Sequence, residues 1–173
     1  MLEAKVLGIT RLGDSGFPAV LLRHAERVLF ISIGPPEAGA IQLALVGEKT
    51  PRPMTHDLVC NILAGLSGRV ESVAIYKLEE QTFFGYLNVE QLDEEGALLQ
   101  GLRIDARPSD AIAIALRVGC PIYISEEVMK EAGHDVDLLG PMFSGEDDDD
   151  NDTEEDEEDE EDDEEERDDD FEF

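Results

Sequence analysis

The chain has 173 residues and a formal net charge of −30. Residues 1–144 carry 12 basic and 20 acidic side chains, a net charge of −8, whereas residues 145–173 carry 1 and 23, a net charge of −22. The acidic stretch lacks the apolar surface needed to offset the entropy of ordering. We therefore expect one folded domain at 1–144 and a disordered polyacidic tail at 145–173. No apolar run reaches the ~18 residues of a membrane span, which argues against a membrane protein.

The first half of the chain predicts three strands and two helices. Runs rich in β-forming residues at 3–12, 17–23 and 28–33 are typical of antiparallel strands. Pro35, Pro36 and Glu37 suit a first helical turn, so a helix is expected from Pro35 to about Val46. A second helix is expected from Thr55, a good N-cap, to a stop at Gly68, because apolar residues follow at helical spacing.

The second half continues with strands at 70–78, 82–92 and 97–105, a helix at 108–118, a short strand at 121–124 and a helix at 125–132. The fold class expected is α+β: a mixed, mostly antiparallel sheet with about four helices in one compact domain. Segments 33–45 and 104–116 both contain a strand end, a proline and a small-apolar helix. Two explanations stay open, a duplicated sheet-and-helix unit or two buried helices of similar composition.

The cysteines and the start of the chain indicate a compartment. Glu3 and Lys5 interrupt the first segment, which is not typical of a signal peptide. Cys60 and Cys120 lie in apolar helical or strand-like contexts, where free thiols are commoner than disulfides. These features predict a cytoplasmic protein.

The stretch from Ile104 to Ala111, Ile-Asp-Ala-Arg-Pro-Ser-Asp-Ala, is the most informative one for chemistry. Strand alternation predicts Asp105 and Arg107 on one face, while Ser109 and Asp110 open a helix whose N-terminal amides favour anions. Phosphodiester cleavage uses such a set, with carboxylates for a divalent cation (Mg or Mn) and a planar arginine for the phosphate. The structural alternative is that Ser109 caps the helix, Asp110 favours its dipole and Arg107 pairs with Asp105.

Two further groups are candidates for the same site. His56 lies at a helix start, where an imidazole can act as a base or metal ligand, and Asp57 follows it. We expect His56 to lie within reach of the same cleft as Asp110, as a base or ligand. The alternative is an exposed histidine beside a dipole-stabilising Asp57. Glu126 is a third candidate metal ligand, although acids after an N-cap are ordinary capping chemistry.

Several strings resemble one known family. These are Thr55-His56-Asp57-Leu58, Gly85-Tyr86-Leu87, Ile104 to Ala113, Pro121-Ile122-Tyr123 and Glu126-Glu127-Val128, and together they are similar to the bifunctional nuclease family over about residues 2–133. The Arg-Pro-Ser-Asp-Ala string is the most specific part. The resemblance implies activity on DNA and RNA and a compact mixed α/β fold. It supplies no catalytic residue set.

The predicted site therefore follows from the residues. Its catalytic members are His56, Asp57, Asp105, Arg107 and Asp110; its substrate-binding members are Arg52, Arg103, Arg107 and Ser109; and its metal ligands are Asp105, Asp110 and Glu126. Arg117 would join the arginines if the fold gathers them into a patch. Scattered basic residues argue against a nucleic-acid surface, but a bound cation can bridge acidic groups to phosphate.

The competing hypothesis is a non-catalytic interaction module, a homodimer formed through a sheet edge or an apolar helix face. The tail would then keep the protein soluble or dock on a protein partner through Phe171 and Phe173. A tethered acidic tail would also compete with nucleic acid for basic groups. Deleting residues 145–173 is therefore expected to strengthen nucleic-acid binding at low salt, and the difference is expected to shrink as salt rises.

Overall fold

The computed structural model describes residues 1–12 and 16–137. Both the predicted tail at 145–173 and the predicted domain end at Ser144 lie outside the described residues. Within the described part of the chain, no helix is long and apolar enough to cross a membrane.

The fold class expected from the sequence is confirmed. The first half contains β1 (Leu2–Leu12), β2 (Phe17–His24), β3 (Arg27–Ser32), α1 (Pro35–Leu45) and α2 (Thr55–Gly65). The second half contains β4 (Gly68–Glu79), β5 (Thr82–Leu92), β6 (Leu98–Ala106), α3 (Pro108–Val118), β7 (Ile122–Ile124), α4 (Glu126–Ala132) and β8 (Gly133–Asp135). Among the described residues, all eight strands join one sheet in the order β6-β5-β4-β7-β1-β2-β3-β8. Only the β4–β7 pairing is parallel there.

The two halves repeat one topology. Strands β1, β2 and β3 form an antiparallel meander followed by α1, and strands β4, β5 and β6 form a second meander followed by α3. Helices α1 and α3 pack against each other, and the short β7 joins the two meanders at the middle of the sheet. This arrangement favours the duplicated unit suggested by segments 33–45 and 104–116.

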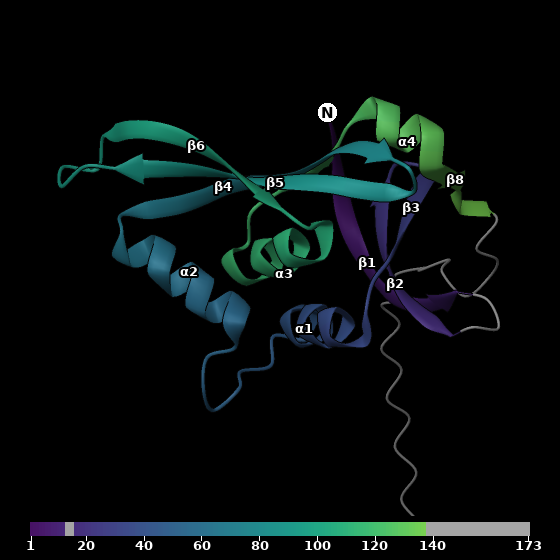
Figure 1. Cartoon of the computed structure of the whole chain (residues 1–173), viewed down its shortest axis with the longest axis horizontal. Helices are drawn as coiled ribbons and strands as arrows, with labels where there is room; N and C mark the ends of the chain where they lie inside the picture. The colour runs from purple at the N-terminus through teal and green to yellow at the C-terminus, as the bar shows by residue number, and fades with distance from the viewer. Residues whose placement is uncertain (13–15, 138–173) are drawn as a thin grey trace, which may run out of the picture. The chain divides into compact units, whose positions relative to one another are not determined.

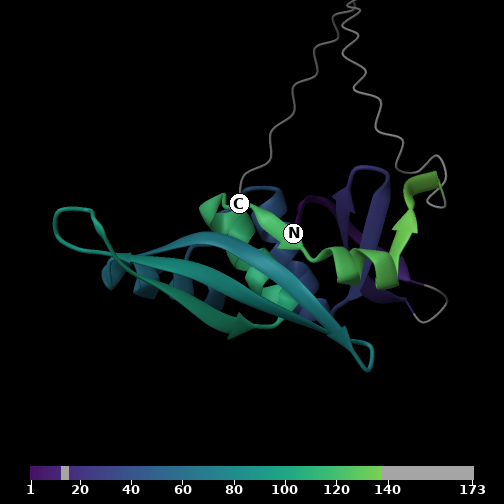
Figure 2. The same ribbon diagram turned by 90° about the horizontal axis from the view of Figure 1, so that it is seen from above.

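Helix α3 is the centre of the core. Five consecutive residues, Ala111 to Ala115, are buried, because this small-apolar helix lies between the sheet and both α1 and α2. Figures 1 and 2 show α1, α2 and α3 on one side of β4 and β5, and α4 on the other. The opposite face of β4, β5 and β6 therefore stays largely free of helices in the described chain.

Two local expectations were wrong, the N-cap of α2 and the strand alternation that grouped Arg107 with Asp105, and one short strand was missed. Met54, not Thr55, is the N-cap of α2, because the Asp57 carboxylate accepts a hydrogen bond from the Met54 amide (2.8 Å). Strand β6 ends at Ala106, and Arg107 is the extended N-cap of α3, as expected for a residue before proline. Residues after α4 form β8, which pairs with β3 and carries too few residues for a sequence signal.

Candidate functional site

The start of α3 is built by the Arg107-Pro108-Ser109-Asp110 string. Pro108 occupies the first helical position, where its fixed φ fits and its missing N–H costs nothing. Arg107 therefore stands just outside the helix and Asp110 in its first turn, close enough to pair. The Arg107 Nε donates to Asp110 Oδ2 at 2.8 Å, and Nη2 donates to Oδ1 at 3.3 Å.

This pair connects all three helices on the inner side of the sheet. The Arg107 Nη1 donates to Glu37 Oε1 in the first turn of α1 at 3.0 Å. His56 Nε2, in the first turn of α2, lies 3.1 Å from Asp110 Oδ1. We call Glu37, Arg107, Asp110 and His56 the α3 N-terminal network. His56 thus contacts Asp110, whereas its role as base or ligand in the cleft stays a prediction.

Exposure differs strongly along the network. The Arg107 side chain is 67% exposed, whereas that of His56 is only 15% exposed. The Nδ1 atom of His56 is buried and has no hydrogen-bond partner among the described residues. A proton on Nδ1 would therefore be unsatisfied, so the neutral ring carries its proton on Nε2 and donates it to Asp110.

The charges of the network reinforce one another. Burial alone would raise the pKa of Asp110, but hydrogen bonds from Arg107 and His56 and the charge of Arg107 outweigh it and hold that pKa below its usual value. The Asp110 carboxylate in turn raises the pKa of Arg107, through its hydrogen bond first and its charge second. The pair is therefore an ionised cation and anion at neutral pH.

Arg107 faces a cavity of about 370 Å³. Glu37, Pro108 and Ser109 line it from the starts of α1 and α3, and Ser32, Gln81 and Thr82 line it from the strand ends. Two helix N-termini, a guanidinium and three hydroxyl groups thus border one cavity. A planar guanidinium favours a phosphate oxygen, whereas the Glu37 carboxylate lines the same cavity and the prolines that begin the two helices, Pro35, Pro36 and Pro108, have no backbone N–H.

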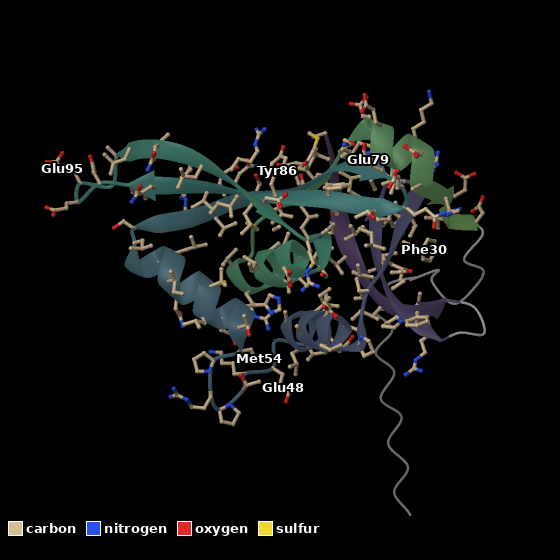
Figure 3. The ribbon with its side chains drawn as sticks, viewed as in Figure 1. Phe30, Glu48, Met54, Glu79, Tyr86 and Glu95 are labelled. Atoms are coloured by element: carbon tan, nitrogen blue, oxygen red, sulfur yellow. The ribbon has the colours of Figure 1, made fainter. Side chains whose placement is uncertain are left out.

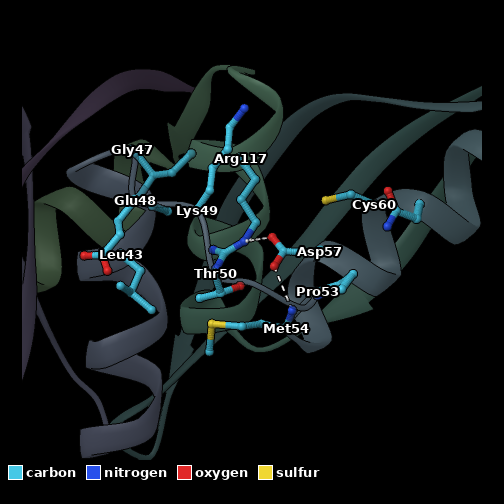
Figure 4. A pocket seen from close by; sticks show the side chains of 13 residues that line it. Leu43, Gly47, Glu48, Lys49, Thr50, Pro53, Met54, Asp57, Cys60 and Arg117 are labelled. Carbon is cyan, nitrogen blue, oxygen red and sulfur yellow. Dashed lines mark hydrogen bonds and ion pairs between the residues drawn. The ribbon is translucent and has the colours of Figure 1, made fainter.

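The opposite end of α3 carries a second arginine–aspartate pair, shown in Figure 4. The Arg117 Nε donates to Asp57 Oδ1 at 2.7 Å, and its Nη1 donates to the backbone oxygens of Ala40 (3.1 Å) and Ala113 (2.8 Å). The Arg117 side chain is only 12% exposed. The Met54 amide, and then Arg117, lower the pKa of Asp57. This pair ties the start of α2 to α1 and α3, and it lines a separate cavity of about 460 Å³.

The other predicted site residues lie apart from the network. Asp105 is exposed on β6 opposite Tyr86 of β5, and no hydrogen bond joins it to Arg107 in the described structure. Arg103 also lies on β6, Arg52 is exposed before α2, and Glu126 is exposed at the start of α4. Arg117 points inward, so it adds nothing to a surface patch. Ser109 is buried at the second helical position and makes no capping hydrogen bond.

The predicted metal ligands do not fit a metal centre in this arrangement. No group of three or more His, Cys, Asp or Glu side chains within residues 1–12 and 16–137 is placed to hold a metal ion. The carboxylates of Asp110 and Glu37 are each bonded to Arg107 instead. Asp105, Asp110 and Glu126 come from β6, α3 and α4 and form no such group.

Glu37 and the Asp57–Arg117 pairing were missed by the sequence reasoning. The similarity of segments 33–45 and 104–116 could have indicated that Glu37 lies near Arg107, because it implies that the starts of α1 and α3 occupy related positions. An acid at one start and an arginine at the other then become candidates for pairing. Nothing local to Asp57 indicates a partner 60 residues away.

The fold and its cavity define an α+β domain with a cavity lined by Arg107 and Glu37 at the start of a buried helix. Comparison with known sequences identifies the family to which this domain belongs. The bifunctional nuclease domain matches residues 20–137, and the chain belongs to that family. It is 41% identical over 133 residues to the uncharacterized proteins MT1877 and Rv1829 of two Mycobacterium tuberculosis strains (CDC 1551 / Oshkosh and ATCC 25618 / H37Rv), covering 76% of each chain.

Proposed function

We propose that this protein hydrolyses phosphodiester bonds of DNA and RNA in the cavity beside Arg107. The observation that carries the proposal is the α3 N-terminal network, which ends in an exposed guanidinium at a cavity bordered by two helix starts. Membership of the bifunctional nuclease family supports nucleic acid as the substrate.

In this proposal Arg107 contacts the phosphate and stabilises the charge that develops on its oxygens in the transition state. Glu37 shares the cavity, so its carboxylate takes the proton from an attacking water. The water oxygen bonds to phosphorus, the bond to the leaving sugar oxygen breaks, and that oxygen takes a proton from solvent. Asp110 and His56 are positioning residues, because Asp110 fixes Arg107 and His56 fixes Asp110.

No step of this proposal passes through a metal, since the described carboxylates form no metal centre. The prediction of Mg or Mn dependence is tested directly by running the assay in both ions, in calcium and in a chelator. A requirement for Mg or Mn would indicate that nucleic acid supplies ligands that the protein alone does not.

The test is cleavage of plasmid DNA and of end-labelled RNA by the full chain near neutral pH. Glu37→Gln keeps the shape of the side chain but removes the base, and is expected to lower the rate at least ~10-fold. Glu127→Gln, an exposed acid on α4, is the matched control and is expected to cleave like the wild type. Absence of cleavage in every ion, or equal rates in all three proteins, contradicts the proposal.

One observation favours the second candidate function, a dimeric interaction module. Strand β6 is an edge of the sheet, and its apolar side chains Leu98, Leu99, Leu102 and Ile104 are exposed. An open edge of this kind can pair with a second copy of the chain. Sedimentation of the wild type and of Leu102→Lys tests this: a dimer that the lysine converts to monomer supports it, and a wild-type monomer contradicts it.

The location we propose is the cytoplasm. Cys60 and Cys120 are free thiols, as their sequence context indicates, and free thiols persist in a reducing compartment. Detection of the protein outside the cytoplasmic fraction of its cell would contradict this assignment.

A further inference from the structure

Three aromatic rings gather on the face of the sheet away from α1, α2 and α3. The ring of Tyr76 on β4 lies 5.1 Å from that of Tyr86 and 6.5 Å from that of Phe84, both on β5, between ring centroids. Tyr76 is 38% exposed. Figure 3 labels Tyr86 on this side of β5. We call Tyr76, Phe84 and Tyr86 the aromatic face.

Two cations lie over these rings. The Arg103 guanidinium carbon, on β6, is 4.4 Å from the centre of the Tyr86 ring, and Lys77 Nζ is 5.3 Å from that of Phe84. Lys77 also pairs with Glu79 at 2.7 Å, whereas Arg103 makes no ion pair with the described residues. Arg103 therefore keeps its charge available to a ligand.

The Gly85-Tyr86-Leu87 motif explains how the strand serves both sides of the sheet. A Cβ on Gly85 would lie 3.2 Å from the backbone oxygens of Ala106 and Ala74, so glycine allows α3 to start close to β5. Leu87 is buried under the helices. Tyr86 alternates to the other side, where packing of α3 does not require it. Packing of the core therefore accounts for Gly85 and Leu87 but not for Tyr86.

We propose that the aromatic face, with Arg103, stacks the bases of single-stranded nucleic acid, DNA or RNA. Base faces match exposed aromatic rings, and a guanidinium beside the rings can contact a base face or a phosphate. Here the apolar surface consists of rings with cations beside them, and both groups suit a base face and its phosphate. Asp105, directly across from Tyr86, is an acceptor for exocyclic amino groups of bases.

The inference rests on the proposed function and names how that site recruits its substrate. Arg103 lies on β6, and Arg107 directly follows the end of that strand, four residues on and roughly 13 Å away at the rise of a β-strand. The aromatic face and the Arg107 cavity lie on opposite sides of the sheet, so a nucleic-acid strand stacked on the aromatic face would pass round the edge strand β6 to bring a neighbouring phosphate to the cavity. In this inference the aromatic face strengthens substrate binding, whereas the Arg107 cavity sets the rate of cleavage.

The test is binding of the full chain to labelled dT15 and rU15 at low salt, followed by fluorescence anisotropy. Tyr86→Leu is expected to weaken binding of at least one of the two about tenfold, the effect of losing one stacked base. Tyr86→Phe keeps the ring and is expected to bind within about twofold of the wild type. Phe17→Leu changes an exposed ring on β2 and is the matched control, expected to bind like the wild type.

Arg103→Gln gives a second variant on the exposed edge strand, where a folding defect is not expected, and binding about fivefold weaker is predicted. An abasic oligonucleotide is expected to bind the wild type as weakly as dT15 binds Tyr86→Leu. Equal binding of dT15 and rU15 by the wild type and folded Tyr86→Leu overturns the inference. A wild type that binds neither oligonucleotide also overturns the inference. If Tyr86→Leu changes only the sedimentation of the protein, the inference is overturned and the aromatic face is assigned to contact with a second copy of the chain.

A chromogenic phosphodiester without bases separates this inference from the proposed function. If the wild type hydrolyses this diester and Tyr86→Leu does so equally while losing oligonucleotide binding, both proposals hold. If neither protein hydrolyses the diester or cleaves nucleic acid, but oligonucleotide binding still depends on Tyr86, the proposed function fails and the inference about the aromatic face stands. If both cleave and bind alike, the stacking face fails and the proposed function stands.

Discussion

The two ends of α3 carry similar arginine–aspartate pairs in contrasting surroundings. At the start of the helix, Arg107 is largely exposed and faces a cavity, and Asp110 continues to His56. At the end, the Arg117 side chain is only 12% exposed and donates to two backbone oxygens as well as to Asp57. Consecutive residues of α2, His56 and Asp57, therefore serve opposite ends of one helix.

The contrast shows that residue type alone does not separate chemistry from structure. Each of the two guanidinium groups donates three hydrogen bonds, so the difference lies in their exposure: the Arg117 side chain is 12% exposed, whereas that of Arg107 is 67% exposed and open to a ligand. A guanidinium in solvent contributes little stability through its ion pairs. We therefore assign a structural part to the Arg117 end and ligand binding to the Arg107 end.

Removing Arg107 is expected to have the largest effect. Arg107→Ala takes away the group that stabilises the transition-state phosphate, so kcat/KM for DNA and RNA is expected to fall about 100-fold. The free energy of unfolding is expected to change by about 1 kcal/mol or less, because the pair is exposed. Steady-state cleavage together with urea unfolding measures both. A full rate in Arg107→Ala would move the active site elsewhere.

Arg117→Met is expected to show the reverse pattern. The substitution keeps much of the volume but removes three hydrogen bonds and the cationic partner of Asp57, so the protein is expected to lose about 2 kcal/mol of unfolding free energy. This is below the usual loss for a buried pair, since Asp57 is partly exposed. Cleavage per folded molecule is expected to stay close to the wild type. Unchanged stability in denaturant would show that the pair does not hold the helices together.

The pH dependence of the unfolding free energy also tests the structural part assigned to the Arg117 end of α3, and the expected effect is smaller. The pKa of Asp57 is lower in the folded state than in the unfolded chain, where it is about 3.9. Its contribution is therefore present above that pH and is lost as the pH falls through the folded pKa. Asp57→Asn is expected to be less stable than the wild type at pH 6 and to lose less on acidification from pH 5 to 3. Asp105→Asn, exposed on β6, is the control and is expected to keep the wild-type slope.

Much of the fold follows from the sequence because its signals are local. Strand runs, proline at the starts of α1 and α3, and helical spacing after Thr55 each depend on neighbouring residues. The N-cap of α2 was misassigned because Asp57, three residues on, bonds to the Met54 amide and fixes the helix start there. Strand β8 has only three residues and depends on pairing with the distant β3.

The site was predictable only in part, for a similar reason. The string from Arg107 to Asp110 contains its own pairing, and the scarcity of histidine drew attention to His56. Glu37 is separated from Arg107 by 70 residues, and only the packing of α1 on α3 brings the two together. The grouping of Asp105 with Arg107 assumed that the strand continues to Arg107, whereas the proline ends it one residue earlier.

The most direct test of the account compares the two aspartates at the two ends of α3. Asp110→Asn and Asp57→Asn make the same chemical change, and each is measured for cleavage per folded molecule and for urea unfolding. We predict that Asp110→Asn lowers cleavage at least ~10-fold, because Arg107 loses its charged anchor, while Asp57→Asn mainly lowers stability. Full cleavage by correctly folded Asp110→Asn would contradict the assignment of the chemical site to the start of α3.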